Sequence, residues 1–211
     1  IIIVVLGALL EKTGASGVLM DIAVSMTRNS RGGPAKAAVV GSSLMGMISG
    51  TAVANVLTTG TISIPLMRRG GYRPAVAGAV EAVASTGGQL MPPIMGAAAF
   101  LMADIMEVPY LDITKAALLP ALLFYIAVFA SVHLEAIKIG LRPLESIDIP
   151  DVAQSLRNSG HVLLSIPVFI GTLISGYSVM YSSLAGIICL LALSLFRHSS
   201  RLNPRQLIAA A

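Results

Sequence analysis

Uncharged stretches of different lengths follow one another along the chain, and their lengths predict how each relates to a membrane. A helix needs about 20 residues to cross the hydrocarbon core. Residues 37–67 contain no charged residue, but Ser49-Gly50-Thr51 interrupts this stretch near its middle. One continuous helix of that length would measure about 45 Å, which is too long without a strong tilt. Two half-helices that meet at the interruption would each reach only the midplane, and this pattern predicts a re-entrant hairpin over residues 34–70.

Basic residues on both sides of this segment favour the hairpin over a single crossing. Two clusters flank it, with Arg28, Arg31 and Lys36 before the interruption and Arg68, Arg69 and Arg73 after it. The positive-inside rule places both clusters on the cytoplasmic side of the membrane. A re-entrant hairpin satisfies that placement, whereas a single crossing does not.

The next apolar stretch, residues 71–110, carries a second interruption. Residues 87–93 read Gly-Gly-Gln-Leu-Met-Pro-Pro, and the glycines and prolines remove both helix propensity and backbone donors. We expect a discontinuous transmembrane helix here, with half-helices at about 74–86 and 93–105 and an unwound link between them. The acidic residues that follow, beginning at Asp104, are typical of the periplasmic side.

The remaining segments also predict helices. From Ala15, apolar residues recur at helical spacing while Asp21, Ser25 and Arg28 occupy the other face, as in a helix that lies in the membrane interface. The predicted order is a truncated transmembrane helix (1–10), an interfacial amphipathic arm helix (11–33), the hairpin (34–70), the discontinuous helix (71–110), a transmembrane helix (111–137), a cytoplasmic loop (138–160), two transmembrane helices (161–198) and the start of a further helix (199–211). Both ends fall inside predicted helices, so we expect the sequence to be a fragment.

Composition supports the lipid bilayer as the environment of the chain. Of the 211 residues, 55% are hydrophobic and 11% are charged, and the mean hydropathy is +0.85. A soluble domain carries about 25% charged residues, so this balance excludes an ordinary cytosolic enzyme, a disordered protein and a nucleic-acid-binding protein. The net charge of +4 comes from short clusters that act as topology signals. Cys189 is the only cysteine, which excludes disulfides within this sequence and metal sites built from several cysteines.

The two interruptions are the places where chemistry is expected. Unwound backbone at membrane depth is tolerated only where it is buried in protein or lines a water-filled site. Helices that end near Ile48 and Thr86 would direct free carbonyls to the midplane, and helices that begin near Ala52 and Pro93 would direct free amides there. Carbonyl and hydroxyl oxygens suit a hard cation such as sodium, and amides suit an anionic substrate. The pattern therefore predicts a transport site.

Glu81 is the one carboxylate expected well inside a span. Such a group is a candidate cation ligand, proton carrier or partner of a basic residue. The alternative is that it extends to the cytoplasmic interface or pairs with Arg73.

One short motif resembles the active-site motif of an enzyme. Gly14-Ala15-Ser16-Gly17 has the G-x-S-G form found around the nucleophile of intramembrane serine proteases, which need a histidine as base. No histidine is expected inside a span, and Ser16 is better explained near the start of a helix. We therefore expect no enzyme activity and no organic cofactor.

Several motifs together resemble a known family. They are Gly41-Ser42-Ser43, then Ser49-Gly50-Thr51-Ala52-Val53-Ala54-Asn55, then Ile64-Pro65-Leu66-Met67, and then Gly87-Gly88-Gln89-Leu90-Met91-Pro92-Pro93-Ile94-Met95-Gly96. This combination is similar to the large membrane subunit of tripartite ATP-independent periplasmic (TRAP) transporters. The second glycine-rich stretch is most like the fused permeases of the TAXI branch.

The resemblance implies an all-α, multi-pass protein of a bacterial or archaeal inner membrane. Its fold would be the elevator fold of the ion-transporter superfamily, with one inverted repeat present and the second missing, so these 211 residues alone are not expected to transport. The implied function is sodium-coupled symport of an organic anion. The implied partners are a periplasmic substrate-binding protein and a small membrane subunit or its fused equivalent.

The resemblance also implies roles for individual residues. A bound sodium ion would be held by residues at the two interruptions, namely Ser49, Gly50, Thr51, Asn55, Gly87 and Gly88. The substrate would contact Asn55, Gln89, Thr51 and Pro92. The alternative function is an ion channel or membrane scaffold in which the hairpin serves as a pore loop.

Overall fold

The computed structural model describes residues 2–141 and 152–196. The predicted helix start at 199–211 and residues 142–151 of the predicted loop lie outside the described residues. Every described secondary-structure element is a helix. Their order is α1 (Ile2–Lys12), α2 (Ala15–Thr27), α3 (Gly33–Ser49), α4 (Ala52–Arg69), α5 (Pro74–Gly87), the 3-10 helix η1 (Gly88–Leu90), α6 (Ala97–Met106), α7 (Tyr110–Lys138), α8 (Val152–Ser159), the 3-10 helix η2 (Gly160–Leu164), α9 (Ser165–Ile174) and α10 (Val179–Phe196).

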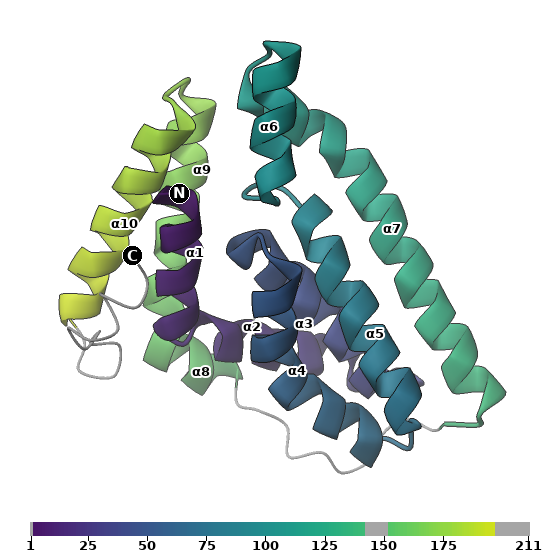
Figure 1. Cartoon of the computed structure of the whole chain (residues 1–211). Helices are drawn as coiled ribbons and strands as arrows, with labels where there is room; N and C mark the ends of the chain where they lie inside the picture. The colour runs from purple at the N-terminus through teal and green to yellow at the C-terminus, as the bar shows by residue number, and fades with distance from the viewer. Residues whose placement is uncertain (1, 142–151, 197–211) are drawn as a thin grey trace.

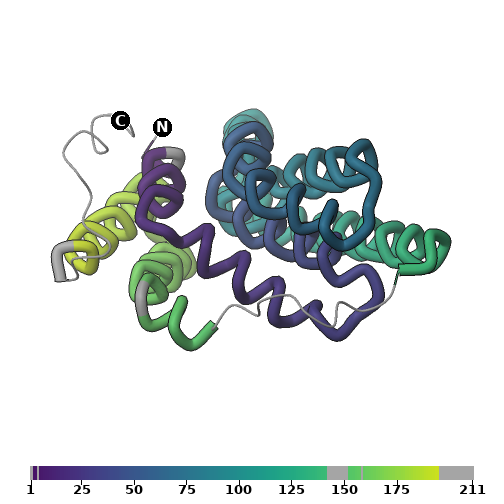
Figure 2. The backbone as a smooth tube through the Cα atoms, turned by 90° about the horizontal axis from the view of Figure 1, so that it is seen from below, coloured from purple at the N-terminus to yellow at the C-terminus, as the bar shows by residue number. Residues whose placement is uncertain are grey.

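The helices form two groups that α2 connects. The antiparallel pair α3 and α4 packs with α5, η1 and α7 in one group, and α1 packs with α10 and α9 in the other (Figure 1). Seen from below, α2 runs from the end of α1 along the first group, where it packs on α3 (Figure 2). A buried core crosses from one group to the other and includes Leu6 of α1, Met45 of α3, Ile94 and Phe169 of α9.

The helix ends separate into two layers that agree with the predicted charge distribution. The start of α3, the end of α4, the start of α5 and the end of α7 lie at the lower end of the molecule in Figure 1. The tip between α3 and α4 lies near mid-height, while α6 and the start of α7 lie at the upper end. The arrangement is that of a hairpin whose two open ends share one side.

α7 is the only described helix long and apolar enough to qualify as a complete span. It has 29 residues and extends beyond both bounds of the predicted segment 111–137. Shorter apolar helices are α2, α6, the continuous run of η2 and α9, and α10. Many apolar side chains of α7 are exposed, including Leu119 and Ile126, as expected for a helix that contacts lipid.

Two details differ from the predicted pattern. The second half of the discontinuous helix begins at Ala97 rather than at 93, because Met95 adopts a left-handed conformation and Gly96 an extended one. In α2, the apolar spacing that starts at Ala15 takes in residues 15, 18, 19, 22, 23 and 26; Met26 is 73% exposed, whereas Met20 and Val24, outside that spacing, are buried. The buried face of α2 is therefore wider than the spacing predicts, since α3 packs against Met20.

Candidate functional site at the meeting of two helix breaks

The two interruptions in the helices lie directly against each other. A Cβ atom added to Gly46 of α3 would lie 2.4 Å from the Cα atom of Gly88, and one added to Gly50 would lie 2.4 Å from the carbonyl oxygen of Met95. No side chain fits at such distances, so the backbones meet only because these positions are glycine. The hairpin tip and the link of the broken helix therefore form one site.

Local backbone geometry places helix ends of both polarities at this site. α3 ends at Ser49, where Gly50 takes a left-handed conformation and its N–H donates to the carbonyl oxygen of Gly46. Thr51 is extended and α4 begins at the next residue, so carbonyls at the end of α3 lie close in sequence to amides at the start of α4. On the other side, α5 continues into η1, and the N–H of Gly96 closes the link by donating to the carbonyl oxygen of Gln89 at 2.8 Å.

Most of the residues predicted to bind sodium lie together at the tip, and Gly87 is the exception. Asn55 is fully buried, and its Nδ2 atom donates to the carbonyl oxygen of Ser42 at 2.8 Å, which ties α4 to α3. Ser49 is also buried, and its hydroxyl lies 3.4 Å from the carbonyl oxygen of Thr51. Gly87 lies against α7 instead, since a Cβ atom there would be 2.1 Å from the ring of Phe124.

The residues predicted to contact substrate occupy the rim of the site. Gln89 is exposed, and Pro92 and Thr51 are partly exposed. Asn55, the fourth of this set, lies beneath them in the hairpin. The rim therefore offers one amide side chain and one hydroxyl beside the start of α4.

Glu81 lies in a cage of hydroxyl groups below the tip. Its side chain is fully buried. Oε1 accepts hydrogen bonds from Ser42 at 3.0 Å, from Ser85 at 2.9 Å and from Thr59, and Oε2 accepts one from Ser63. The donors come from α3, α4 and α5, so one carboxylate joins three helices.

This environment disfavours the two structural alternatives for Glu81, and its role as cation ligand or proton carrier stays a prediction. Full burial excludes the alternative in which the side chain extends to the interface, and Arg73 is exposed and forms no ion pair within the described residues. The cage is connected to the tip, because the backbone oxygen of Asn55 lies 2.8 Å from Thr59 Oγ1 and competes with Glu81 for the same hydroxyl proton. Thr59 is therefore the one residue between Glu81 and Asn55 in this network.

Sequence reasoning missed two kinds of contact, one inside the cage around Glu81 and one between the groups of helices. Ser85 follows Glu81 by four residues, and this spacing places both on one face of α5, so the pairing was readable from sequence. The second contact is between the groups of helices. Thr58 of α4 donates to Glu11 of α1, and Gly7 lies so close to Ile48 that a Cβ atom would be 2.5 Å from its carbonyl oxygen. Such pairings depend on packing and leave no pattern in the sequence.

Comparison with known proteins identifies the family. A model of the tripartite ATP-independent periplasmic transporter family, DctM component, matches residues 1–211. The chain belongs to this family. The resemblance drawn from the hairpin and broken-helix motifs is therefore confirmed, and so is its assignment to TRAP permeases.

Individual relatives of this TRAP component are longer than the chain. The C4-dicarboxylate TRAP transporter large permease protein of Pseudomonas aeruginosa is 29% identical over 170 residues, which cover 81% of this chain and 39% of that protein. The protein YgiK of Salmonella typhimurium is 27% identical over 192 residues, covering 90% of this chain and 44% of that protein. The protein y4mL of Sinorhizobium fredii is 32% identical over 105 residues, covering 50% and 25%. The chain thus spans less than half the length of these relatives.

Membership of the TRAP family indicates that these helices lie in a membrane. The family consists of integral inner-membrane transporters, and an all-helical protein with exposed apolar side chains along α7 agrees with that setting. A family of permeases is a family of transporters, not of enzymes.

Proposed function

We propose that the full-length protein containing this chain is a sodium-coupled symporter of an organic anion in the inner membrane. The observation that carries the proposal is the direct contact between two helix breaks, with a carbonyl end and an amide end adjacent at the hairpin tip. The name of the relative from Pseudomonas aeruginosa supports a carboxylate, of the C4-dicarboxylate kind, as the class of substrate.

The proposed roles follow from what each group offers. Sodium would lie at the end of α3, where Ser49 and Thr51 offer hydroxyls beside backbone carbonyls. A substrate carboxylate would meet the free amides at the start of α4 and α6, with Gln89 at the rim. Asn55 would hold the arms together through Nδ2, and its Oδ1, which has only a long contact of 3.5 Å with Thr59, would face an ion.

The division into two groups of helices supports an elevator mechanism. In this proposal the hairpin, α5 and η1 move together, since the Glu81 cage and the glycine contacts join them. α2 packs on both α1 and α3, and in this proposal it is the arm between the moving unit and α1. The periplasmic binding protein would deliver the anion, and the small membrane subunit and the second repeat would come from outside this sequence.

Uptake into proteoliposomes tests the proposal. The full-length protein with its binding protein should accumulate a labelled C4-dicarboxylate when a sodium gradient is applied. Ser49→Ala should raise the sodium concentration for half-maximal uptake by about fivefold, since one hydroxyl ligand contributes about 1 kcal/mol.

Thr61→Ala is the matched control for this experiment. Thr61 lies exposed on α4, and its hydroxyl bonds only within that helix, to the carbonyl oxygen of Thr58. It should leave uptake unchanged. Uptake by Ser49→Ala with an unaltered sodium dependence would reject the tip as the cation site. Single-channel currents in place of gradient-driven accumulation would identify a channel.

A further inference from the structure

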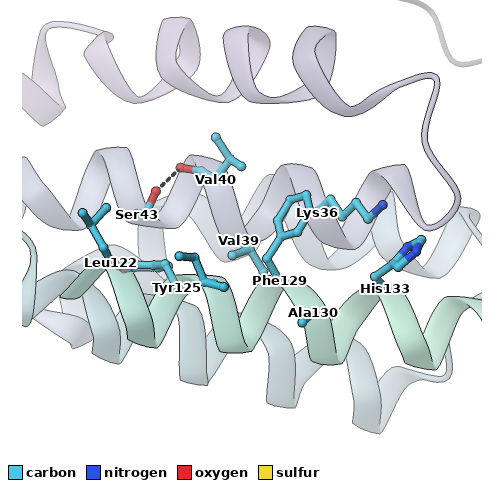
Figure 3. Close-up of a pocket in the computed structure, with 10 residues that line it drawn as sticks. Lys36, Val39, Val40, Ser43, Leu122, Tyr125, Phe129, Ala130 and His133 are labelled. Carbon is cyan, nitrogen blue, oxygen red and sulfur yellow. Dashed lines mark hydrogen bonds between the residues drawn. The ribbon is translucent and has the colours of Figure 1, made fainter. Parts of the chain in front are cut away.

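A pocket between α3 and α7 lies outside the transport site. Its volume is about 530 Å³, which falls in the range of small-molecule sites. Ten residues line it, namely Lys36, Val39, Val40, Ser43, Leu122, Tyr125, Ile126, Phe129, Ala130 and His133. Most of this lining is apolar, and the pocket follows the two helices lengthwise (Figure 3).

The polar groups along the body of the pocket are already satisfied. The hydroxyl of Ser43 donates to the carbonyl oxygen of Val40 at 2.7 Å, and that of Tyr125 donates to the carbonyl oxygen of Ala84 at 2.8 Å. These walls therefore present hydrocarbon to whatever fills the pocket.

One end of the pocket is different, because it carries nitrogen groups without an anionic partner. Lys36 and His133 lie at the same end of the pocket (Figure 3). Lys36 is only 5% exposed, its Nζ atom lies 5.2 Å from the ring centre of Phe129, and no described carboxylate forms an ion pair with it. The Nδ1 atom of His133 is buried and has no hydrogen-bond partner among the described residues.

The ammonium group of Lys36 has no countercharge among the described residues, and its contact with the ring of Phe129 is a favourable interaction that does not neutralise it. This end of the pocket lies where α3 begins and α7 ends, at the side of the molecule with the predicted cytoplasmic ends of the helices. An anion placed here would lie beside Lys36 and His133 and in the interface.

From these observations we propose that the pocket binds an anionic phospholipid of the cytoplasmic leaflet. The phosphate lies at Lys36 and His133, and one acyl chain follows Val39, Val40 and Leu122 between the two helices. Charge complementarity at one end and an apolar body along the rest fit a molecule with both properties. The inference extends beyond the proposed transport function and does not depend on the ion or the substrate.

Native mass spectrometry of the full-length protein tests the proposal. Phosphatidylglycerol and phosphatidylcholine with identical acyl chains are the probes, and phosphatidylglycerol should be retained preferentially. Lys36→Gln should lower this preference about fivefold, as one basic residue near a membrane surface contributes about 1 kcal/mol. Lys138→Gln removes the same charge from the exposed end of α7 and should leave the preference unchanged.

A second pair of variants separates the pocket from general charge effects. Ala130→Phe places a ring in the pocket without changing charge and should abolish phosphatidylglycerol retention, whereas Ala127→Phe adds the same ring to an exposed position of α7 that does not line the pocket. Equal retention in Lys36→Gln and the native protein, or in both phenylalanine variants, would overturn the proposal. So would cross-links from a diazirine in the acyl chain that never reach α3 or α7.

Discussion

Replacing Glu81 by glutamine tests whether one buried carboxylate fastens the hairpin to α5. The substitution Glu81→Gln keeps the size of the side chain and removes the negative charge that four hydroxyl groups share. A hydrogen bond to a charged group contributes about 1.5–3 kcal/mol and a neutral one about 0.5–1.5 kcal/mol. Each bond thus loses about 1 kcal/mol, and the four together lose about 4 kcal/mol of the free energy of unfolding.

Other partners of two of the hydroxyls reduce this loss. Ser42 Oγ lies 3.1 Å from Thr59 Oγ1, and the single hydroxyl proton of Thr59 can be donated to the backbone oxygen of Asn55, 2.8 Å away, instead of to Glu81. These alternative partners remain when the charge is removed. We therefore expect Glu81→Gln to destabilise the protein by about 2 to 4 kcal/mol.

Titration of the full-length protein with sodium dodecyl sulfate, followed by circular dichroism, measures this difference. Glu81→Gln should unfold at a lower detergent fraction than the native protein. Glu107→Gln makes the same chemical change at an exposed residue at the end of α6 and should unfold with the native protein. Coincident curves for Glu81→Gln and the native protein would refute the reasoning, because they would mean that no charge is held in the cage.

Two further predictions concern the tip and the orientation of the chain. Gly50→Ala should abolish uptake, since its φ of 63° disfavours a side chain and a Cβ atom would meet Met95, while Gly78→Ala should be tolerated because a Cβ atom there meets nothing within 4 Å. The uptake of each glycine variant is compared with that of the native protein at equal expression. Single cysteines that replace Arg31 and Arg69 should react only with a thiol reagent added from the cytoplasmic side. Labelling of the two positions from opposite sides would contradict the re-entrant hairpin.

The positions of the breaks could be predicted because their causes are local. Gly50 takes a left-handed conformation that ends α3, and two adjacent prolines follow η1. A sequence shows both directly. The exact start of α6 could not be predicted, because Met95 adopts a positive φ of 57° only in the context of the tip that packs on it.

The partners of Glu81 show the other limit. Ser42, Thr59 and Ser63 are three of many serines and threonines between residues 42 and 63, but such residues often bond to their own helix, as Ser43 does here. Only the packing of α5 between the hairpin and α7 shows which hydroxyls turn toward the carboxylate. Burial of a charge is a property of three helices together, and no single stretch of sequence contains it.

The chemistry of the contacts indicates where a moving unit would separate from a fixed one. Within the hairpin and α5, the contacts are buried hydrogen bonds to a carboxylate, which require fixed positions of donor and acceptor. Toward α1, the hairpin packs the backbone at Ile48 against Gly7, buries apolar side chains such as Met45 against α1, and has a partly buried bond from Thr58 to Glu11. Apolar contacts have no preferred direction, so they resist sliding less than buried hydrogen bonds do. In the elevator motion that we propose, the boundary therefore runs between α1 and the hairpin.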